Sequence, residues 1–187
     1  MQSSFVLFFI ILGLLFGKWR RYQEYYPTLL FWVTGNLLYE VLLFHHRVWV
    51  FHPVGIDHLF LPDHLMVSLG ITLIIYPFVI PVFLGRLQLH VSGSLWWILL
   101  WALLFTVIEF IAYVNHSITH HYGWSLLCSF LFNIVTFSLL IIHQKTALAA
   151  WILSGSFLAF LFIFLIFLCL NFSLTRRRKR KYNRNYI

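Results

Sequence analysis

Long apolar runs separated by short polar connections dominate the chain. Six such runs can be marked, at residues 4–17, 27–44, 65–84, 95–114, 124–142 and 149–170. Most approach the roughly 17–25 residues that a helix needs to cross a bilayer, and none shows the two-residue alternation of a membrane β-barrel. Only helices and closed barrels satisfy the backbone in lipid. The pattern therefore predicts an all-α polytopic transmembrane helix bundle with six spans and no β-sheet.

Three of these runs contain local signals that bear on their boundaries. The run at 4–17 is short, but no basic residue precedes it and no small-residue cleavage site follows, so we interpret it as an uncleaved helix and not a signal peptide. Pro27 can open the second helix, because the N–H that proline lacks is unpaired at that position anyway. Pro77 and Pro81 should kink the third helix.

Composition supports burial in lipid and limits the expected partners. Hydrophobic residues make up 61% of the chain and charged residues 10%, against roughly 25% in soluble domains. We divide the chain into a transmembrane domain, residues 1–175, and a basic C-terminal tail, residues 176–187. The formal net charge of +8 suits membrane orientation and contact with anionic lipid headgroups. Nucleic acid is not an expected partner, since no soluble domain presents the tail.

The connection at residues 45–64 is unusually polar for this chain. It holds five of the ten histidines and two of the five acidic residues. With six spans, this second connection and the fourth, at residues 115–123, must share one side of the membrane. That side then collects eight histidines, and the ends of the second and fourth spans add Glu40 and Glu109. We call it the histidine face and expect any polar chemistry to be there.

The basic residues give conflicting evidence about orientation. Those of the internal connections fall mostly on the opposite side: Lys18, Arg20, Arg21, Arg86 and Lys145. By the positive-inside rule the histidine face is extracytoplasmic. Six spans, however, place the seven basic residues of the tail on that same face. Either the tail is translocated or only five runs cross, and the proline-containing third run is then the one we expect to fail.

Glu109 heads a candidate polar stripe. Tyr113, His116 and His120 follow it at intervals of four, seven and eleven residues, so they share one face if the helix continues through Asn115. Carboxylates hydrogen-bonded to histidine orient metal-ligating imidazoles in many proteins. The alternative is structural, with Glu109 protonated or paired with a neighbouring helix.

The dipeptides Asp57-His58 and Asp63-His64 provide further possible ligands. Histidine and carboxylate together suit zinc, iron, copper or nickel, although H-E-x-x-H and other regular spacings are absent. The alternative is interfacial histidines that never meet and aspartates that cap helices, Asp63 being well placed to cap the third helix. The candidate site for a divalent transition metal has five members: His58, His64, Glu109, His116 and His120.

Two serines and two cysteines carry less weight. Ser68 and Ser125 lie near histidines, but no G-x-S-x-G element surrounds them, so their case as nucleophiles is weak. Cys128 and Cys169 both lie within apolar runs. A disulfide or a cysteine-based metal site is therefore not expected.

Several short segments, in order and spacing, resemble a family of small polytopic membrane proteins from Bacillus- and Clostridium-type endospore formers. They are K-W-R-R-Y-Q-E-Y-Y-P-T (18–28), G-N-L-L-Y (35–39), L-P-D-H (61–64), Y-P (76–77), E-F (109–110), H-Y-G-W (121–124), F-N (132–133) and His143. The resemblance covers residues 18 to about 151. It implies a bacterial cytoplasmic-type membrane and a sporulation context, and it implies no activity. The basic tail after Thr175 departs from the family pattern.

Three kinds of function remain open from the sequence. The first is a non-enzymatic membrane protein with a structural or partner-binding role, the partner being another membrane protein. The second is a metal-dependent membrane enzyme, a hydrolase of lipid or peptide, that uses the histidine face. The third is a small transporter that uses Glu40, Glu109, Asn133 and the proline-containing helix. The transporter is the weakest because only Asn133, and next Asn36, lies deep within a run.

Overall fold

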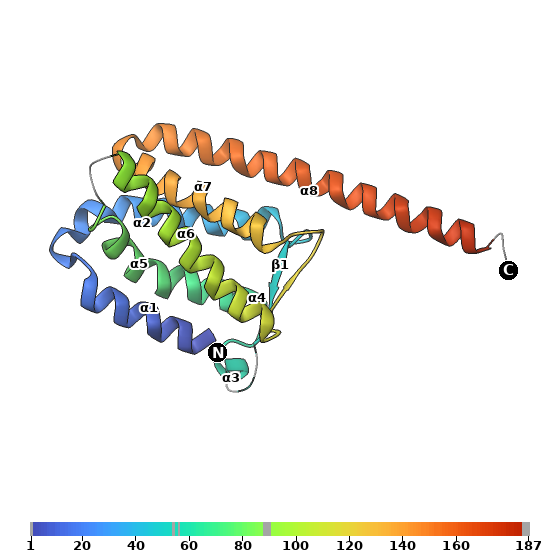
Figure 1. Ribbon diagram of the computed structural model, residues 1–187, viewed down its shortest axis with the longest axis horizontal. Helices are drawn as coiled ribbons and strands as arrows, with labels where there is room; N and C mark the ends of the chain where they lie inside the picture. The colour runs from blue at the N-terminus through green and yellow to red at the C-terminus, as the bar shows by residue number, and fades with distance from the viewer. Residues whose placement is uncertain (1, 54, 56, 88–90, 185–187) are drawn as a thin grey trace.

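The computed structural model describes residues 2–53, 55, 57–87 and 91–184. Most of them are helical (Figure 1). The longer helices are α1 (Gln2–Phe16), α2 (Tyr22–Leu42), α4 (His64–Gly70), α5 (Tyr76–Phe83), α6 (Val91–Val114), α7 (Leu126–Lys145) and α8 (Ala147–Arg184). Shorter elements are η1 (Trp19–Arg21), α3 (Asp57–Phe60), the π-helical turn η2 (Ile71–Ile75) and the strands β1 (Trp49–Phe51) and β2 (Ile118–His120). The prediction of an all-α architecture is confirmed for the bulk of the chain.

Four of the described helical segments are long and apolar enough to cross a membrane. They are His64–Phe83, Gly93–Val114, Leu126–Lys145 and Ala147–Phe164. The segments Ser3–Phe16 and Trp19–Leu42, bent by 88° at their junction, count as a fifth if taken as one broken span. These helices indicate a multi-pass membrane protein. Length alone does not make α1 a separate span, because its 15 residues extend only about 22 Å, against a hydrocarbon core of roughly 30 Å.

Successive helices run in alternating directions along the bundle (Figure 1). The connections after α2 and after α6 therefore lie at the same end, as the sequence predicted, and β1 and β2 join them in an antiparallel ribbon. Its register pairs Trp49 with His120, Val50 with Thr119 and Phe51 with Ile118. We call this end of the bundle the ribbon end.

The ribbon corrects the prediction that the protein has no β-sheet. The two connections leave backbone N–H and C=O groups outside any helix, and each connection supplies partners for the other. His121 N–H donates to the carbonyl of Val48, and His52 N–H donates to the carbonyl of Ser117. The pairing is possible because both connections emerge at one end of the bundle.

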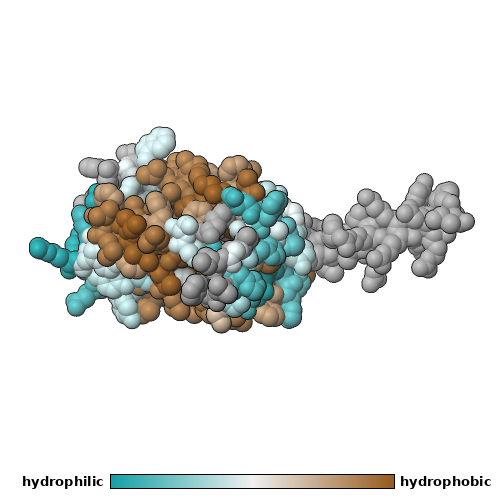
Figure 2. Space-filling model, turned by 90° about the horizontal axis from the view of Figure 1, so that it is seen from below, coloured by the Kyte–Doolittle hydropathy of each residue, from teal (hydrophilic) through white to brown (hydrophobic). Residues whose placement is uncertain are grey.

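The opposite end carries most of the basic residues of the internal connections, and we call it the basic end. Lys18 N–H donates to the carbonyl of Pro81, and Arg86 Nε donates to the carbonyl of Phe16. These bonds tie the turn between α1 and α2 to the end of α5. In the face shown in Figure 2, apolar residues cover the middle and hydrophilic residues gather toward both ends, as expected for a protein embedded in a bilayer.

The third run forms a helical segment of 20 residues that qualifies as a span, so the expectation that it would fail to cross is not supported. The π-helical turn Ile71–Ile75 lies immediately before Pro77 and changes the hydrogen-bond pattern where proline provides no donor. Thr72 Oγ1 also donates to the carbonyl of Ser68. The part of the chain that counts as a span only when two bent helices are taken together is instead the α1–α2 pair.

Other helix boundaries correct or confirm local predictions. Pro27 lies inside α2, five residues after its start, so it does not open the helix as predicted. The segment before it continues as helix because η1 leads directly into Tyr22. Asp63 caps α4 as predicted, its side chain accepting from the Met66 N–H. Ser125 caps α7 in the same way, through the Cys128 N–H.

Helix α8 runs well past the last predicted span. It has 38 residues and a length of about 57 Å, so it exceeds the bilayer core and projects beyond the bundle at the ribbon end (Figure 1). The predicted basic tail is thus helical as far as Arg184, while residues 185–187 lie outside the described part of the chain.

The core of the bundle is aromatic and lies between the two ends. Trp32 stacks on Tyr76 at a centroid distance of 3.7 Å, and Phe137 is fully buried.

Candidate functional site

The five residues predicted as metal ligands are divided by the structure. His120 and Glu109 form one pair, with Nε2 and Oε1 2.7 Å apart, while His64 is paired with Glu40 instead, at 3.3 Å. No group of three histidine, cysteine or acidic side chains suited to a metal occurs among the described residues. The reason is geometric, because each of these imidazoles reaches the carboxylate at the end of a different helix.

His58 and His116 contribute little to either pair. His58 N–H donates to the carbonyl of Gly55, and His116 N–H donates to the carbonyl of Tyr113. His116 has a left-handed backbone conformation, with φ of 56°, so the helix does not continue to His120 as the predicted stripe required. His120 comes back to Glu109 from strand β2. Glu109 and His120 are therefore brought together by strand pairing and not by the continuous helix that the predicted stripe required.

Glu40 is held in a buried polar cluster near the ribbon end. Its Oε1 accepts from Ser68 Oγ at 2.6 Å, and its Oε2 accepts from His64 Nε2. Arg47 Nε lies 3.9 Å from Oε2, an ion pair without a hydrogen bond. Both oxygens of this carboxylate are therefore already engaged by side chains of the protein.

The strand β1 determines the tautomer of His64. The alternating bonds of the ribbon turn the N–H of Phe51 away from β2, and it donates to His64 Nδ1 at 3.0 Å. The nitrogen that accepts this bond carries no proton, so the proton lies on Nε2 and is donated to Glu40. His64 is accordingly a neutral imidazole with both nitrogens occupied.

The cluster continues toward the middle of the bundle. Asn36 Nδ2 donates to Thr72 Oγ1 at 2.7 Å and to Ser68 Oγ at 3.4 Å, and Tyr76 Oη donates to Asn36 Oδ1 at 3.4 Å. His64, Ser68, Thr72 and Tyr76 recur every four residues along one helical segment. This spacing is visible in the sequence and could have predicted that these four side chains lie on one face of the helix.

Glu109 is held by a second cluster. Its Oε1 accepts from His120 Nε2 and from Ser129 Oγ, the latter at 2.5 Å, and Ser129 Oγ accepts from Trp124 Nε1 at 2.8 Å. The His120 ring stacks on Tyr113, with the centroids 4.9 Å apart. Both bonds end on Oε1, so Oε2 is left without a hydrogen bond from the described residues.

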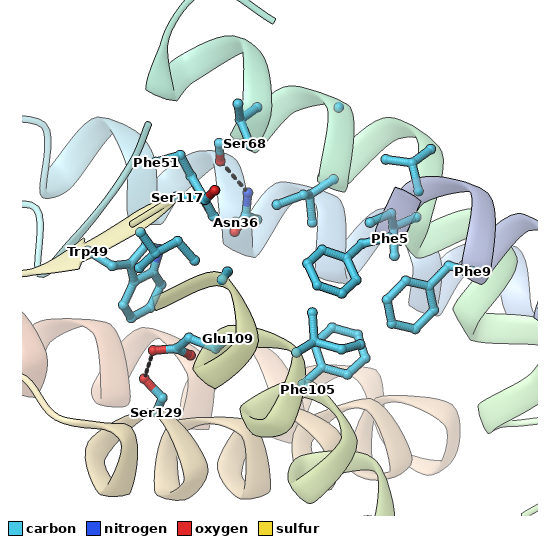
Figure 3. Close-up of a pocket in the computed structure, with 18 of the residues that line it drawn as sticks. Phe5, Phe9, Asn36, Trp49, Phe51, Ser68, Phe105, Glu109, Ser117 and Ser129 are labelled. Carbon is cyan, nitrogen blue, oxygen red and sulfur yellow. Dashed lines mark hydrogen bonds between the residues drawn. The ribbon is translucent and has the colours of Figure 1, made fainter. Parts of the chain in front are cut away.

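A cavity of about 180 Å³ lies between the two clusters, and both carboxylates contribute to its wall. Its polar residues come from α2, the third run, α6, α7 and the position just before β2 (Figure 3). They are Asn36, Glu40, Ser68, Glu109, Ser117, Ser129 and Asn133. The aromatic part of the wall includes Phe5, Phe9, Trp49, Phe51, Phe105 and Phe132. The described lining contains no lysine or arginine.

Ser117 is the one residue of this wall whose side-chain oxygen is buried without a partner among the described residues. The residue is only 1% exposed, and its Oγ accepts and donates no hydrogen bond. A buried hydroxyl without a partner costs free energy. The sequence gives no signal for this burial, because Ser117 lies in a polar connection between two runs.

Asp57 stabilises the start of α1 and does not belong to the described lining of the cavity. It is fully buried, and its Oδ1 accepts from the backbone N–H of Ser3 at 3.3 Å and from the Ser3 hydroxyl. The carboxylate thereby supplies an acceptor at the N-terminus of α1, where backbone N–H groups lack helical partners. Phe5 and Phe9 of α1 are in turn held against the cavity.

Comparison with family models, with curated proteins and with solved structures finds no match to this chain. The site is therefore interpreted from its own geometry.

Proposed function

We propose that the protein is a non-enzymatic integral membrane protein that binds a small, partly apolar ligand in the cavity within its helix bundle. The cavity carries this proposal, since it combines an aromatic wall with a few convergent polar groups, as small-molecule sites do. Its volume of about 180 Å³ is close to that of an engineered cavity of roughly 150 Å³ that admits benzene. A ligand built around one aromatic ring is the appropriate size.

The hydrogen bonds around Ser68 argue against a serine–histidine hydrolase. Such an enzyme needs a histidine nitrogen that accepts the serine proton. Ser68 instead donates to Glu40, and both nitrogens of His64 are occupied by Phe51 and Glu40. The polar groups are thus arranged to hold one another in place, which suits binding more than nucleophilic attack.

We also propose that all six predicted runs cross the membrane, with α1 and α2 as two short or tilted crossings. The alternation of helix directions in Figure 1 and the separation of the ribbon end from the basic end support this count. On this proposal the protein resides in a bacterial cytoplasmic-type membrane, with the basic part of α8 near anionic headgroups. A role linked to sporulation is an expectation that rests on the sequence resemblance alone.

Equilibrium dialysis of the purified full-length protein in detergent tests the binding function, with protein-free micelles as the blank. We expect saturable binding of 2-phenylethylamine or of its neutral isostere 2-phenylethanol, at one ligand per chain. Ala112→Phe should abolish it, because Ala112 is buried and lines the cavity. Ala159→Phe, an equal change on the exposed face of α8, should have no effect. The proposal would be refuted if neither compound showed saturable binding.

A further inference from the structure

Glu109 differs from Glu40 in the number of its carboxylate oxygens that accept a hydrogen bond. Glu40 uses both oxygens, and Arg47 lies beside it as a cation. Glu109 uses Oε1 alone, and His120 is its only ion-pair partner among the described residues. A carboxylate away from water is costly unless an opposite charge is nearby. The wall of the cavity thus contains one carboxylate oxygen that lacks such a partner.

The rest of the wall also suits a positive charge. Its aromatic rings, among them Trp49 and Phe105, have faces that attract cations. Figure 3 shows Glu109, Trp49 and Phe105 around the same space. An anion would find no cationic side chain in the described lining.

We propose that the ligand of this cavity is an organic monocation, an aromatic or alkyl primary amine, whose ammonium group is bound by Glu109 Oε2. The ammonium group donates to this oxygen, and the apolar body of the ligand packs against the phenylalanines. This inference rests on the proposed binding function and specifies its ligand class.

The choice between cation and neutral ligand can be measured with the same pair of compounds. We expect wild-type protein to bind 2-phenylethylamine at least about tenfold more tightly than 2-phenylethanol, because a hydrogen bond between two charged groups is the stronger one. Equal affinities would overturn the inference while leaving cavity binding intact.

Two variants assign the preference to residues. Glu109→Gln keeps the shape and removes the charge, and it should reduce amine affinity by about tenfold or more with little effect on the alcohol. Glu24→Gln is the matched control, since Glu24 is exposed and pairs with Arg21 near the basic end. The comparison of amine and alcohol with wild-type protein serves if Glu109→Gln does not fold. Retention of the full amine preference in a folded Glu109→Gln protein would refute the assigned contact.

Discussion

At the scale of single residues, the polar side chains around Glu40 and Glu109 are bound to one another. Glu40 is an example. His64 and Ser68 donate hydrogen bonds to its carboxylate, and the positive charge of Arg47 lies beside it. Asn36 links this cluster to Thr72 and Tyr76. In a region with little water, each of these groups depends on its partner, so the loss of one acceptor leaves several donors unpaired.

This dependence predicts the effect of Glu40→Ala. The variant should lower the free energy of unfolding by about 2–3 kcal/mol, because His64 Nε2 and Ser68 Oγ lose their acceptor within the bundle. Unfolding by detergent titration in mixed micelles measures the change. Glu24→Ala, which removes an exposed carboxylate of the same helix, should leave stability essentially unchanged. Similar losses in the two variants would contradict the cluster.

At the scale of elements, the ribbon of β1 and β2 positions both clusters. Its register turns the Phe51 N–H toward His64 and brings His120 back to Glu109. Two connections that are 69 residues apart at the Val50–Thr119 pair thereby become parts of one site. The π-helical turn has a related role, since Thr72 lies within it and is bound to Asn36.

Cysteines placed at Val50 and Thr119 test the register of the ribbon. Directly opposed residues of antiparallel strands have Cα atoms about 4.5–5.5 Å apart, within the range that a disulfide bridges. In a background without Cys128 and Cys169, mild oxidation should join the two cysteines and protect both from maleimide. A pair at Val50 and Thr146, located at opposite ends of the bundle, should remain reduced. Free thiols at Val50 and Thr119 after oxidation would show that the strands do not pair.

At the scale of the whole molecule, alternating helices separate a polar, histidine-rich end from a basic end. The ribbon end holds both carboxylate clusters, and the basic end holds the contacts of Lys18 and Arg86. Helix α8 passes the ribbon end and carries the seven basic residues of the tail outward, while Arg47 stays beside Glu40. The two groups of basic residues therefore lie at opposite ends of the molecule.

Thiol labelling from each side of the membrane tests this arrangement. Cysteines at Gly55 and Asn115, both exposed, should react from one side, and a cysteine at Thr146 should react from the other. Gln88, in the connection between the third and fourth runs, lies outside the described residues and is not used. Ser117 is too buried to label. Reaction of Gly55 and Thr146 from the same side would mean that an even number of crossings lies between them, whereas the structure places three membrane-length segments there: His64–Phe83, Gly93–Val114 and Leu126–Lys145.

The sequence by itself determined the helical membrane class, the shared end of the two polar connections and the cap at Asp63. These follow from run length, alternation and local hydrogen bonding, which depend on residues close together in the chain. The pairing of His64 with Glu40, the burial of Ser117 and the cavity between the carboxylates were decided only by the tertiary structure. They depend on the register of β1 against β2 and on a helix that ends before His116, and both arise from contacts between distant segments that no local pattern encodes.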